Sequence, residues 1–382
     1  MEHYDVVIVG GSIAGSVAAR FLAMNNFKVL LVESAKTPRE KPCSAIQFKY
    51  FESLIGSKIP REKLCSNNLK RLYMEWPNGK SFKIPSRMLN FTRDVFDSWL
   101  NDKAVESGAI FRDAVRCTNF RTIPNGFEVF LHPKHGMIEK VSTKYLISAD
   151  GLSSTIRKIV RPQDFYGRGE KSRGITLNYY LKTINEGELN PNTLYQFWNL
   201  DFNNLMFAWS YKKNDLWVVG TGYTEDIQRH CDLLLDYVKE KFKFDGEIVK
   251  REGFASKFRI DEPDHVYLGK ENLLFVGDAA GLVDPYRGLG MDAAALSGRR
   301  AANAILKAEK NGHPAEYYYS KSMRKLVKRI DKNMKRQLLM YKNNDELLEF
   351  LKRSYLKTGI LTGFGILLNK FLSGNRKILL PL

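Results

Sequence analysis

A glycine-rich turn near the start of the chain carries the first residues suited to chemistry. The turn Gly10-Gly11-Ser12-Ile13-Ala14-Gly15 follows the β-branched run Tyr4–Val9 and leads into an amphipathic stretch. Bare amides at a helix start attract anions, because the helix dipole places partial positive charge there. A second apolar run ends at Glu33, and a carboxylate at this separation suits a ribose hydroxyl. The order strand, turn, helix, strand and acid predicts a βαβ unit that binds a dinucleotide, although Ser12 replaces the middle glycine of the usual pattern.

A second turn of the same kind lies far along the chain. The apolar run Leu273–Val276 ends at Gly277-Asp278, and Asp284-Pro285 predicts a further turn. Gly288-Leu289-Gly290-Met291 then begins a stretch of small residues that predicts a closely packed helix. Reduction of a flavin places negative charge on one edge of its ring, and a helix start with bare amides would favour that charge. A buried strand, loop and helix with no ligand is the alternative.

This second turn resembles the third FAD motif of the p-hydroxybenzoate-hydroxylase-like flavoproteins, and more narrowly that of the geranylgeranyl reductase family. The resemblance implies that Asp278 holds the ribityl chain and that the backbone of Gly288, Leu289, Gly290 and Met291 lies beside the isoalloxazine. The glycine turn at residues 10–15 is a variant that is frequent among the same flavoproteins. FAD is therefore the cofactor that the resemblance implies.

Two further segments resemble elements of the reductase family. Lys41-Pro42-Cys43-Ser44-Ala45 is similar to its K-x-C-G-G segment beside the flavin, which makes Cys43 a candidate catalytic residue. Ser44 and Ala45 replace the two family glycines, and a small buried cysteine in a loop is the alternative. Arg93 opens a segment that resembles R-x-x-F-D-x-x-L, where the arginine would contact the cofactor; an ordinary surface arginine is the alternative.

The stretch from Tyr145 to Arg157 resembles the DG motif of these flavoproteins. The resemblance implies that Asp150 and Arg157 tie a strand end to a helix beside the cofactor pyrophosphate. A D-G turn with a serine-rich helix cap also has a purely structural interpretation. The strand at Gly108–Val115 makes the backbone of Val115 a candidate for contact with the adenine.

The segment from residue 172 to residue 222 predicts successive strands rich in aromatic residues. Such a sheet can wall an apolar pocket, although packing in a core would explain most of these aromatics. Phe207-Ala208-Trp209-Ser210-Tyr211-Lys212 resembles the family motif Y-x-W-x-F-P, which lines the lipid site. Phe207, Trp209 and Tyr211 are therefore the substrate-pocket candidates, and Lys212 departs from the pattern.

We expect an α/β fold with a Rossmann-like FAD-binding domain, an inserted antiparallel β-sheet substrate domain and a C-terminal helical segment. The alternation on either side of Pro77-Asn78-Gly79 predicts a hairpin in the substrate domain. The predicted FAD-binding domain takes residues 1–68, 90–165 and 258–305, the substrate domain takes 69–89 and 166–257, and the C-terminal basic and apolar segment takes 306–382.

Composition points to a globular protein with an anionic partner. The net charge is +18, with 44% apolar and 27% charged residues. The sequence contains no run of 18 apolar residues, so it predicts no membrane-spanning helix. The four cysteines are far apart, which suits a reducing cytoplasm and indicates no metal site. The basic stretch Lys321–Arg336 and the apolar clusters of 359–382 suit the inner face of an anionic membrane, with a solvated helix and a packed C-terminus as the alternative. Nucleic acid is disfavoured because no RNA-binding module is visible.

The resemblance implies an FAD-dependent oxidoreductase that reduces C=C bonds of an isoprenoid lipid or quinone side chain by hydride transfer. No second glycine-rich βαβ unit is present, so NAD(P)H or a small electron carrier would bind transiently. The same scaffold supports other reactions. A monooxygenase or halogenase of a small aromatic substrate is one alternative, and a flavoprotein that acts on RNA or has no enzymatic activity is another.

Overall fold

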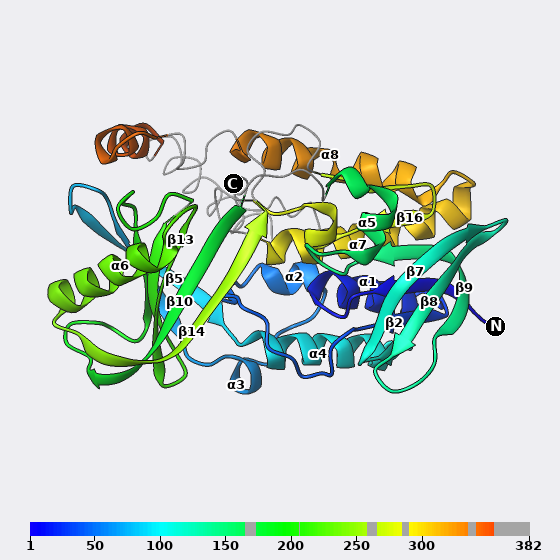
Figure 1. Ribbon diagram of the computed structural model, residues 1–382, viewed down its shortest axis with the longest axis horizontal. Coiled ribbons are helices and arrows are strands. Elements are labelled where there is room, and N and C mark those ends of the chain that lie inside the picture. The colour runs from blue at the N-terminus through cyan, green and yellow to red at the C-terminus, as the bar shows by residue number, and fades with distance from the viewer. Residues whose placement is uncertain (165–172, 206, 258–265, 285–289, 335–340, 355–382) are drawn as a thin grey trace.

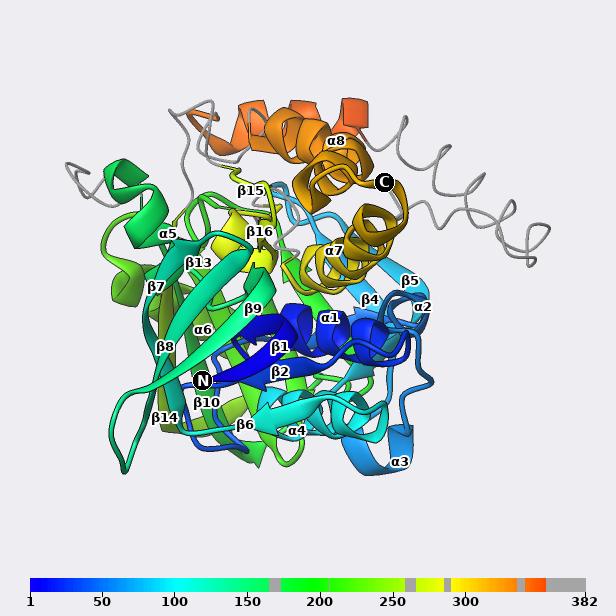
Figure 2. The same cartoon turned by 90° about the vertical axis from the view of Figure 1, so that its right-hand side faces the viewer.

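The computed structural model describes residues 1–164, 173–205, 207–257, 266–284, 290–334 and 341–354 of the 382-residue chain. Two large sheets dominate it, and they stand at opposite ends of the molecule in Figure 1. Sheet A with its flanking helices holds both glycine turns, and sheet B holds the aromatic strands. The view in Figure 2 looks onto the end formed by sheet A.

Sheet A has a parallel core in the order β16-β9-β1-β2-β6, with β15 antiparallel at one edge and β7 and β8 continuing from β9. Val9, Ser148 and Phe275 lie in register at the carboxyl ends of β1, β9 and β16. The turns that follow these three strands therefore meet at one edge of the sheet, where ligands of open α/β sheets bind. The strands are β1 (Glu2–Val9), β2 (Val29–Val32), β6 (Ile110–Arg112), β7 (Val115–Ile123), β8 (Gly126–Pro133), β9 (Glu139–Ser148), β15 (Gly269–Lys270) and β16 (Leu273–Phe275).

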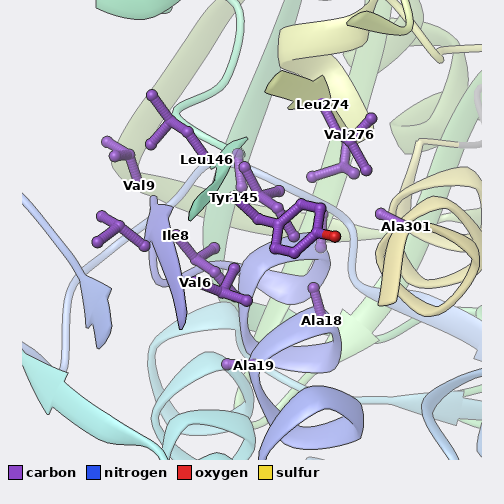
Figure 3. Close-up of a cluster of buried hydrophobic side chains, with 14 of the residues drawn as sticks. Val6, Ile8, Val9, Ala18, Ala19, Tyr145, Leu146, Leu274, Val276 and Ala301 are labelled. Carbon is purple, nitrogen blue, oxygen red and sulfur yellow. The ribbon is translucent and has the colours of Figure 1, made fainter. Parts of the chain in front are cut away.

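Three helices form a layer beside sheet A. Helix α1 (Ile13–Ala23) packs between α4 (Arg93–Glu106) and α7 (Met291–Asn311). The contact between α1 and α7 is very close, because a Cβ built on Gly298 would lie 2.2 Å from the carbonyl oxygen of Ala14. Figure 3 shows the apolar core beneath this crossing, with Val6, Ala18 and Ala301 among its buried side chains. The close crossing fixes the amino ends of both helices relative to the sheet.

Shorter helices complete this half of the molecule. They are α2 (Phe51–Ile55), α3 (Arg61–Leu64), α5 (Thr155–Val160) and the 3-10 helices η1 (Pro162–Asp164) and η3 (Gly277–Ala280).

Sheet B has the order β14-β10-β13-β12-β11-β4-β5-β3 and is antiparallel except for the β11–β4 pair. Its strands are β3 (Ile46–Phe48), β4 (Leu69–Glu75), β5 (Ser81–Asn90), β10 (Arg173–Asn185), β11 (Thr193–Phe197), β12 (Ala208–Lys213), β13 (Leu216–Tyr223) and β14 (Asp245–Lys257). The predicted hairpin is confirmed as β4 and β5. One strand departs from the predicted division, because β3 lies in the range assigned to the cofactor domain and yet pairs with β5.

The two faces of sheet B have different surroundings. Helix α6 (Ile227–Phe242) covers one face, where Tyr179 and Trp217 are buried. Figure 1 shows α6 on the outer side of the sheet. The other face carries Trp209 and Tyr211, which cluster with Tyr180. Alternation along the strands therefore sorts the aromatic residues into a core set beneath α6 and a second set on the opposite face.

The C-terminal part is helical where the structure describes it. Helix α8 (Ala315–Met334) packs on α7, and a helix at residues 344–354 places Leu347 and Leu351 against Trp76 and Trp198. None of the helices within the described ranges combines the length and the apolar character needed to cross a bilayer. The predicted apolar clusters of 359–382 lie outside the described residues.

Candidate functional site

The first glycine turn makes a tight path from β1 into α1. Gly10 has φ +112°, and a Cβ on Gly15 would lie 2.0 Å from the carbonyl oxygen of Gly10. The amides of Ser12, Ile13 and Ala14 donate to no acceptor among the described residues. Amides at the start of an 11-residue helix are a favourable anion site. The predicted pyrophosphate site thus has free donors.

The carboxylate of Glu33 braces this turn. It is buried, and one oxygen accepts the amide of Gly11 at 3.0 Å while the other accepts the amide of Ala35 at 3.0 Å. Arg39 lies 3.4 Å from the first oxygen. Each carboxylate oxygen can accept more than one hydrogen bond, so Glu33 can brace the turn and still meet a ribose hydroxyl.

Arg93 is buried, so the interpretation as an ordinary surface arginine is wrong. Its guanidinium forms two hydrogen bonds of 2.8 Å with Asp97 and one of 2.7 Å with the hydroxyl of Ser12. Burial alone would raise the pKa of Asp97, but Arg93, with Arg39 nearby, lowers it below its usual value. The network fixes the Ser12 side chain, so the serine that replaces the middle glycine is tied to α4.

The second glycine turn comes to the same edge of the sheet. The carboxylate of Asp278 forms no hydrogen bond with a described residue, and the cation that pairs with it is Lys41 at 3.9 Å. Gly290 lies beside it, since a Cβ there would be 3.7 Å from an Asp278 oxygen. Gly288 and Leu289 lie outside the described residues. The carboxylate of Asp278 is therefore available to a ligand hydroxyl at the start of α7.

Cys43 joins this second turn. Its sulfur is half-buried and lies 3.7 Å from the sulfur of Met291, the first residue of α7. Ala45, where the family has glycine, adopts the left-handed conformation with φ +47°. This conformation raises the free energy of a residue other than glycine by about 1 kcal/mol. Cys43 is thus held at the start of α7 by a strained loop.

The DG motif has a clear structural role. Asp150 accepts hydrogen bonds from the hydroxyl of Ser148 and from the amide of Thr155, so it caps α5. Burial raises the pKa of Asp150. Arg157 donates to Asp164 and to the carbonyl of Ala279 in η3, at 2.8 and 2.9 Å. The motif therefore connects the end of β9 to the turn that contains Asp278.

Val115 lies at the start of β7, and its amide donates to the carbonyl of Glu33 at 2.9 Å. This bond sets Val115 beside the acid of the βαβ unit. The structure thus places Val115, the predicted adenine contact, next to Glu33, the predicted ribose contact.

The substrate candidates Trp209 and Tyr211 share one face of sheet B with the half-buried Phe207. Trp209 donates its indole N–H to Asn178 at 2.8 Å. The hydroxyl of Tyr211 is buried and has no partner among the described residues. A buried hydroxyl without a partner is costly and suits a ligand contact. Lys212, which departs from the family motif, pairs with Glu186 and leaves this face.

Gly220 makes the position of Trp209 possible, and Gly220→Ala tests this. A Cβ there would lie 2.3 Å from the indole nitrogen and 2.2 Å from the Asn178 oxygen. We expect the variant to keep its flavin and lose substrate turnover by about tenfold or more, since an overpacked site typically costs 1–3 kcal/mol. Flavin absorbance and steady-state rates measure the two effects.

Gly222→Ala is the matched control on the same strand. The nearest atom to its new Cβ is a Leu205 methyl at 3.1 Å, which can move. Equal losses of turnover in the two variants would contradict the role given to Gly220.

The sequence interpretation missed two residues of this region. Asn178 was not singled out, although a polar residue that alternates with strand aromatics is a signal for a buried hydrogen bond. Lys213 is buried at the end of β12. Its donors reach the carbonyls of Ser44 and Phe91, which a local pattern cannot reveal.

The residues present fit FAD. Among the described residues, free amides lie at the start of α1, and a carboxylate without a hydrogen-bond donor lies at the start of α7. These groups match the anionic pyrophosphate and the ribityl hydroxyls of a flavin nucleotide, respectively.

Comparison with known proteins agrees with this geometry. The model of the FAD binding domain family matches residues 3–316. The chain is 25% identical to the digeranylgeranylglycerophospholipid reductase of Methanococcus vannielii, over 92% of this chain and 90% of that protein. It is 27% identical to the geranylgeranyl diphosphate reductase of Rhodobacter capsulatus, over 82% of this chain and 78% of that one.

Solved structures share the fold. A geranylgeranyl bacteriochlorophyll reductase-like protein from Thermoplasma acidophilum superposes with a TM-score of 0.79 at 21% identity, covering 92% of this chain and 91% of that one. A flavin-dependent brominase gives a TM-score of 0.65 at 19% identity, covering 84% and 83%. The chain belongs to the FAD binding domain family and is an FAD-dependent oxidoreductase related to the geranylgeranyl reductases.

Proposed function

We propose that this protein reduces C=C bonds of an isoprenoid lipid or of a quinone side chain. The observation that carries the proposal is the aromatic face of sheet B, where Trp209 and Tyr211 cluster with Tyr180 on the side opposite α6. Aromatic side chains offer a polyprenyl chain contact area without charge. The names of the two relatives support a substrate of this class.

The chain's own residues would bind and orient both partners of the reaction. Bound FAD, once reduced, supplies the hydride, and NAD(P)H or a small electron carrier restores the reduced state. The aromatic face excludes water from the acceptor bond. We assign to the cofactor Gly10, Gly11, Ser12, Ala14, Gly15, Glu33, Arg93, Val115, Asp150, Asp278, Gly290 and Met291.

The cofactor and the lipid would bind to different parts of the chain, which correspond to the two sheets. We propose that residues 1–68, 90–165 and 258–305 bind the cofactor, with β3 added to the substrate part because it pairs in sheet B. Residues 69–89 and 166–257 would then bind the lipid.

A monooxygenase or halogenase is the second candidate, because a brominase shares the fold. Anaerobic mixing of the photoreduced enzyme with a geranylgeranyl lipid separates the two. A reductase reoxidises its flavin with the lipid in the absence of O2, whereas reoxidation only by O2, with a phenol or halide as co-substrate, would favour the second candidate.

Helix α8 carries a basic stripe, defined as Lys321, Arg324, Lys325, Lys328 and Lys332. All five residues are exposed and none forms an ion pair with a described residue. Their spacing places them on one side of the helix, opposite the buried Met323 and Ile330, which pack into the core. We propose that the stripe holds the protein on the anionic inner face of a cytoplasmic membrane, where a lipid substrate resides.

Replacing Lys321, Lys325 and Lys328 by glutamine should weaken binding to vesicles that contain phosphatidylserine. Each basic residue near such a surface contributes about 1 kcal/mol, so the loss is roughly a hundredfold. Vesicle sedimentation at fixed ionic strength measures it.

The control replaces the exposed Lys63, Lys83 and Lys182 by glutamine, which changes the net charge equally. Equal weakening in both triple variants would show that net charge alone binds the vesicles. Preferential, salt-sensitive binding of RNA by the stripe would contradict the membrane assignment.

A further inference from the structure

Lys213 is a buried lysine at the junction between the two halves of the molecule. It is the last residue of β12, and alternation places it on the same face as Trp209 and Tyr211. Its ammonium donates to the carbonyl of Ser44 at 2.5 Å and to the carbonyl of Phe91 at 2.9 Å. The first carbonyl adjoins Cys43, so the ammonium lies beside the loop that meets the start of α7.

The described partners that contact the Lys213 ammonium are uncharged. The residue is only 6% exposed and forms no ion pair with a described residue. Two carbonyls use two of its three N–H donors, and the ammonium lies over the ring of Tyr211, 5.6 Å from its centre. A buried cation without a paired anion destabilises the fold, which favours a functional role for Lys213.

Several titratable or charged groups surround Lys213 from the elements packed against it. They are Cys43 in the loop, Arg93 and Asp94 on α4, Tyr211 on β12 and Glu252 on β14, and Tyr180 on β10 faces Tyr211 in turn. Glu252 connects these groups to the protein surface. It accepts a hydrogen bond from the Tyr180 hydroxyl at 2.7 Å, and it lies 3.4 Å from the partly exposed Lys250.

We propose that Lys213 is the proton donor of the reduction. This role rests on the proposed function, because the reduction of a C=C bond needs a proton as well as a hydride. The π bond of the substrate breaks, and one of its carbons receives the hydride supplied by the reduced cofactor. The other carbon receives a proton from the Lys213 ammonium. The neutral amine then regains a proton from water, and the nicotinamide or electron-carrier reductant supplies the electrons for the next cycle.

Titration behaviour separates Lys213 from its neighbour Tyr211. Burial lowers the pKa of Lys213 to about 8, which makes its ammonium a stronger acid than an ordinary lysine. Burial raises the pKa of Tyr211 well above its usual value, so the phenol holds its proton. A general acid works best when its pKa lies near the operating pH. Lys213 meets this condition.

The test compares Lys213→Arg, Lys213→Met and Cys43→Ala in the FAD-loaded enzyme. Arginine keeps the charge and can donate to both carbonyls, but it does not release its proton near neutral pH. We expect Lys213→Arg and Lys213→Met to slow anaerobic flavin reoxidation by a geranylgeranyl lipid by about a hundredfold or more. The wild-type rate should fall as the pH rises through about 8, where Lys213 loses its proton, and this fall should be absent from both variants.

Other outcomes would overturn the assignment. A rate restored by Lys213→Arg would make Lys213 a positioning residue for the Cys43 loop, and loss of the pH dependence in Cys43→Ala alone would move the proton to the thiol. A wild-type enzyme that no isoprenoid lipid reoxidises would refute the proposed function, and with it this role. Carbon-13 NMR of lysine Cε in the holoenzyme measures the pKa of Lys213 without any substrate, and the signal of Lys213 is the one that Lys213→Arg removes. An ordinary lysine pKa for that signal would refute the role of Lys213 and leave the proposed function standing.

Discussion

Replacing Arg93 by methionine is expected to abolish FAD binding and to lower the free energy of unfolding by about 3–5 kcal/mol. The reason is that Asp97 would remain buried with only Arg39, 3.3 Å away, as a cationic partner. Ser12 would lose Arg93 and keep only its hydrogen bond to Asp97. Flavin absorbance after gel filtration and urea denaturation measure the two losses.

A double variant separates the two effects. Arg93→Met with Asp97→Leu removes both buried charges and should recover most of the stability, because a buried ion pair can be exchanged for apolar groups at little cost. It should still fail to hold FAD, since Ser12 then loses both Arg93 and Asp97 as hydrogen-bond partners on α4. Full recovery of the flavin would show that Arg93 serves only the stability of the fold.

Replacing Gly298 by alanine should also cost stability, by about 1–3 kcal/mol, although alanine is the better helix former. A Cβ there would lie 2.2 Å from the Ala14 carbonyl oxygen, so α7 must move away from α1. Both helix starts assigned to FAD would shift, and we expect its dissociation constant to rise by roughly tenfold or more. Thermal unfolding and flavin fluorescence titration report the two quantities.

Asn303→Ala on the exposed side of α7 is the control for this prediction. It raises helix propensity without touching α1 and should leave both quantities unchanged. An unchanged or higher stability in Gly298→Ala would contradict the close crossing of the two helices.

The fold was predictable where a pattern was long or a turn was specific. The run before Gly10 and the acid at Glu33 predicted β1, α1 and β2, and Pro77-Asn78-Gly79 predicted the β4–β5 hairpin. The short strand β3 was not predicted, because three residues show no period. Its pairing with β5 depends on a contact that is distant along the chain.

The candidate site was predictable in part for the same reason. Motif order brought Cys43, Asp278 and Met291 into one hypothesis, and the structure places Cys43 and Met291 in contact. Lys213 was missed because a lysine at a strand end is usually solvated. Its acceptor Ser44 lies 169 residues away in the chain, and no local signal connects the two.

Mass spectrometry of the lipid product tests the central claim most directly. The enzyme loaded with FAD and given a chemical reductant without O2 should convert a geranylgeranyl lipid into products heavier by two hydrogen atoms for each bond reduced. In deuterated water, each reduced bond should carry deuterium at the carbon that receives the proton. A lipid recovered unchanged by an enzyme that holds its flavin, or a product that gains oxygen or halogen when O2 is admitted, would contradict the account.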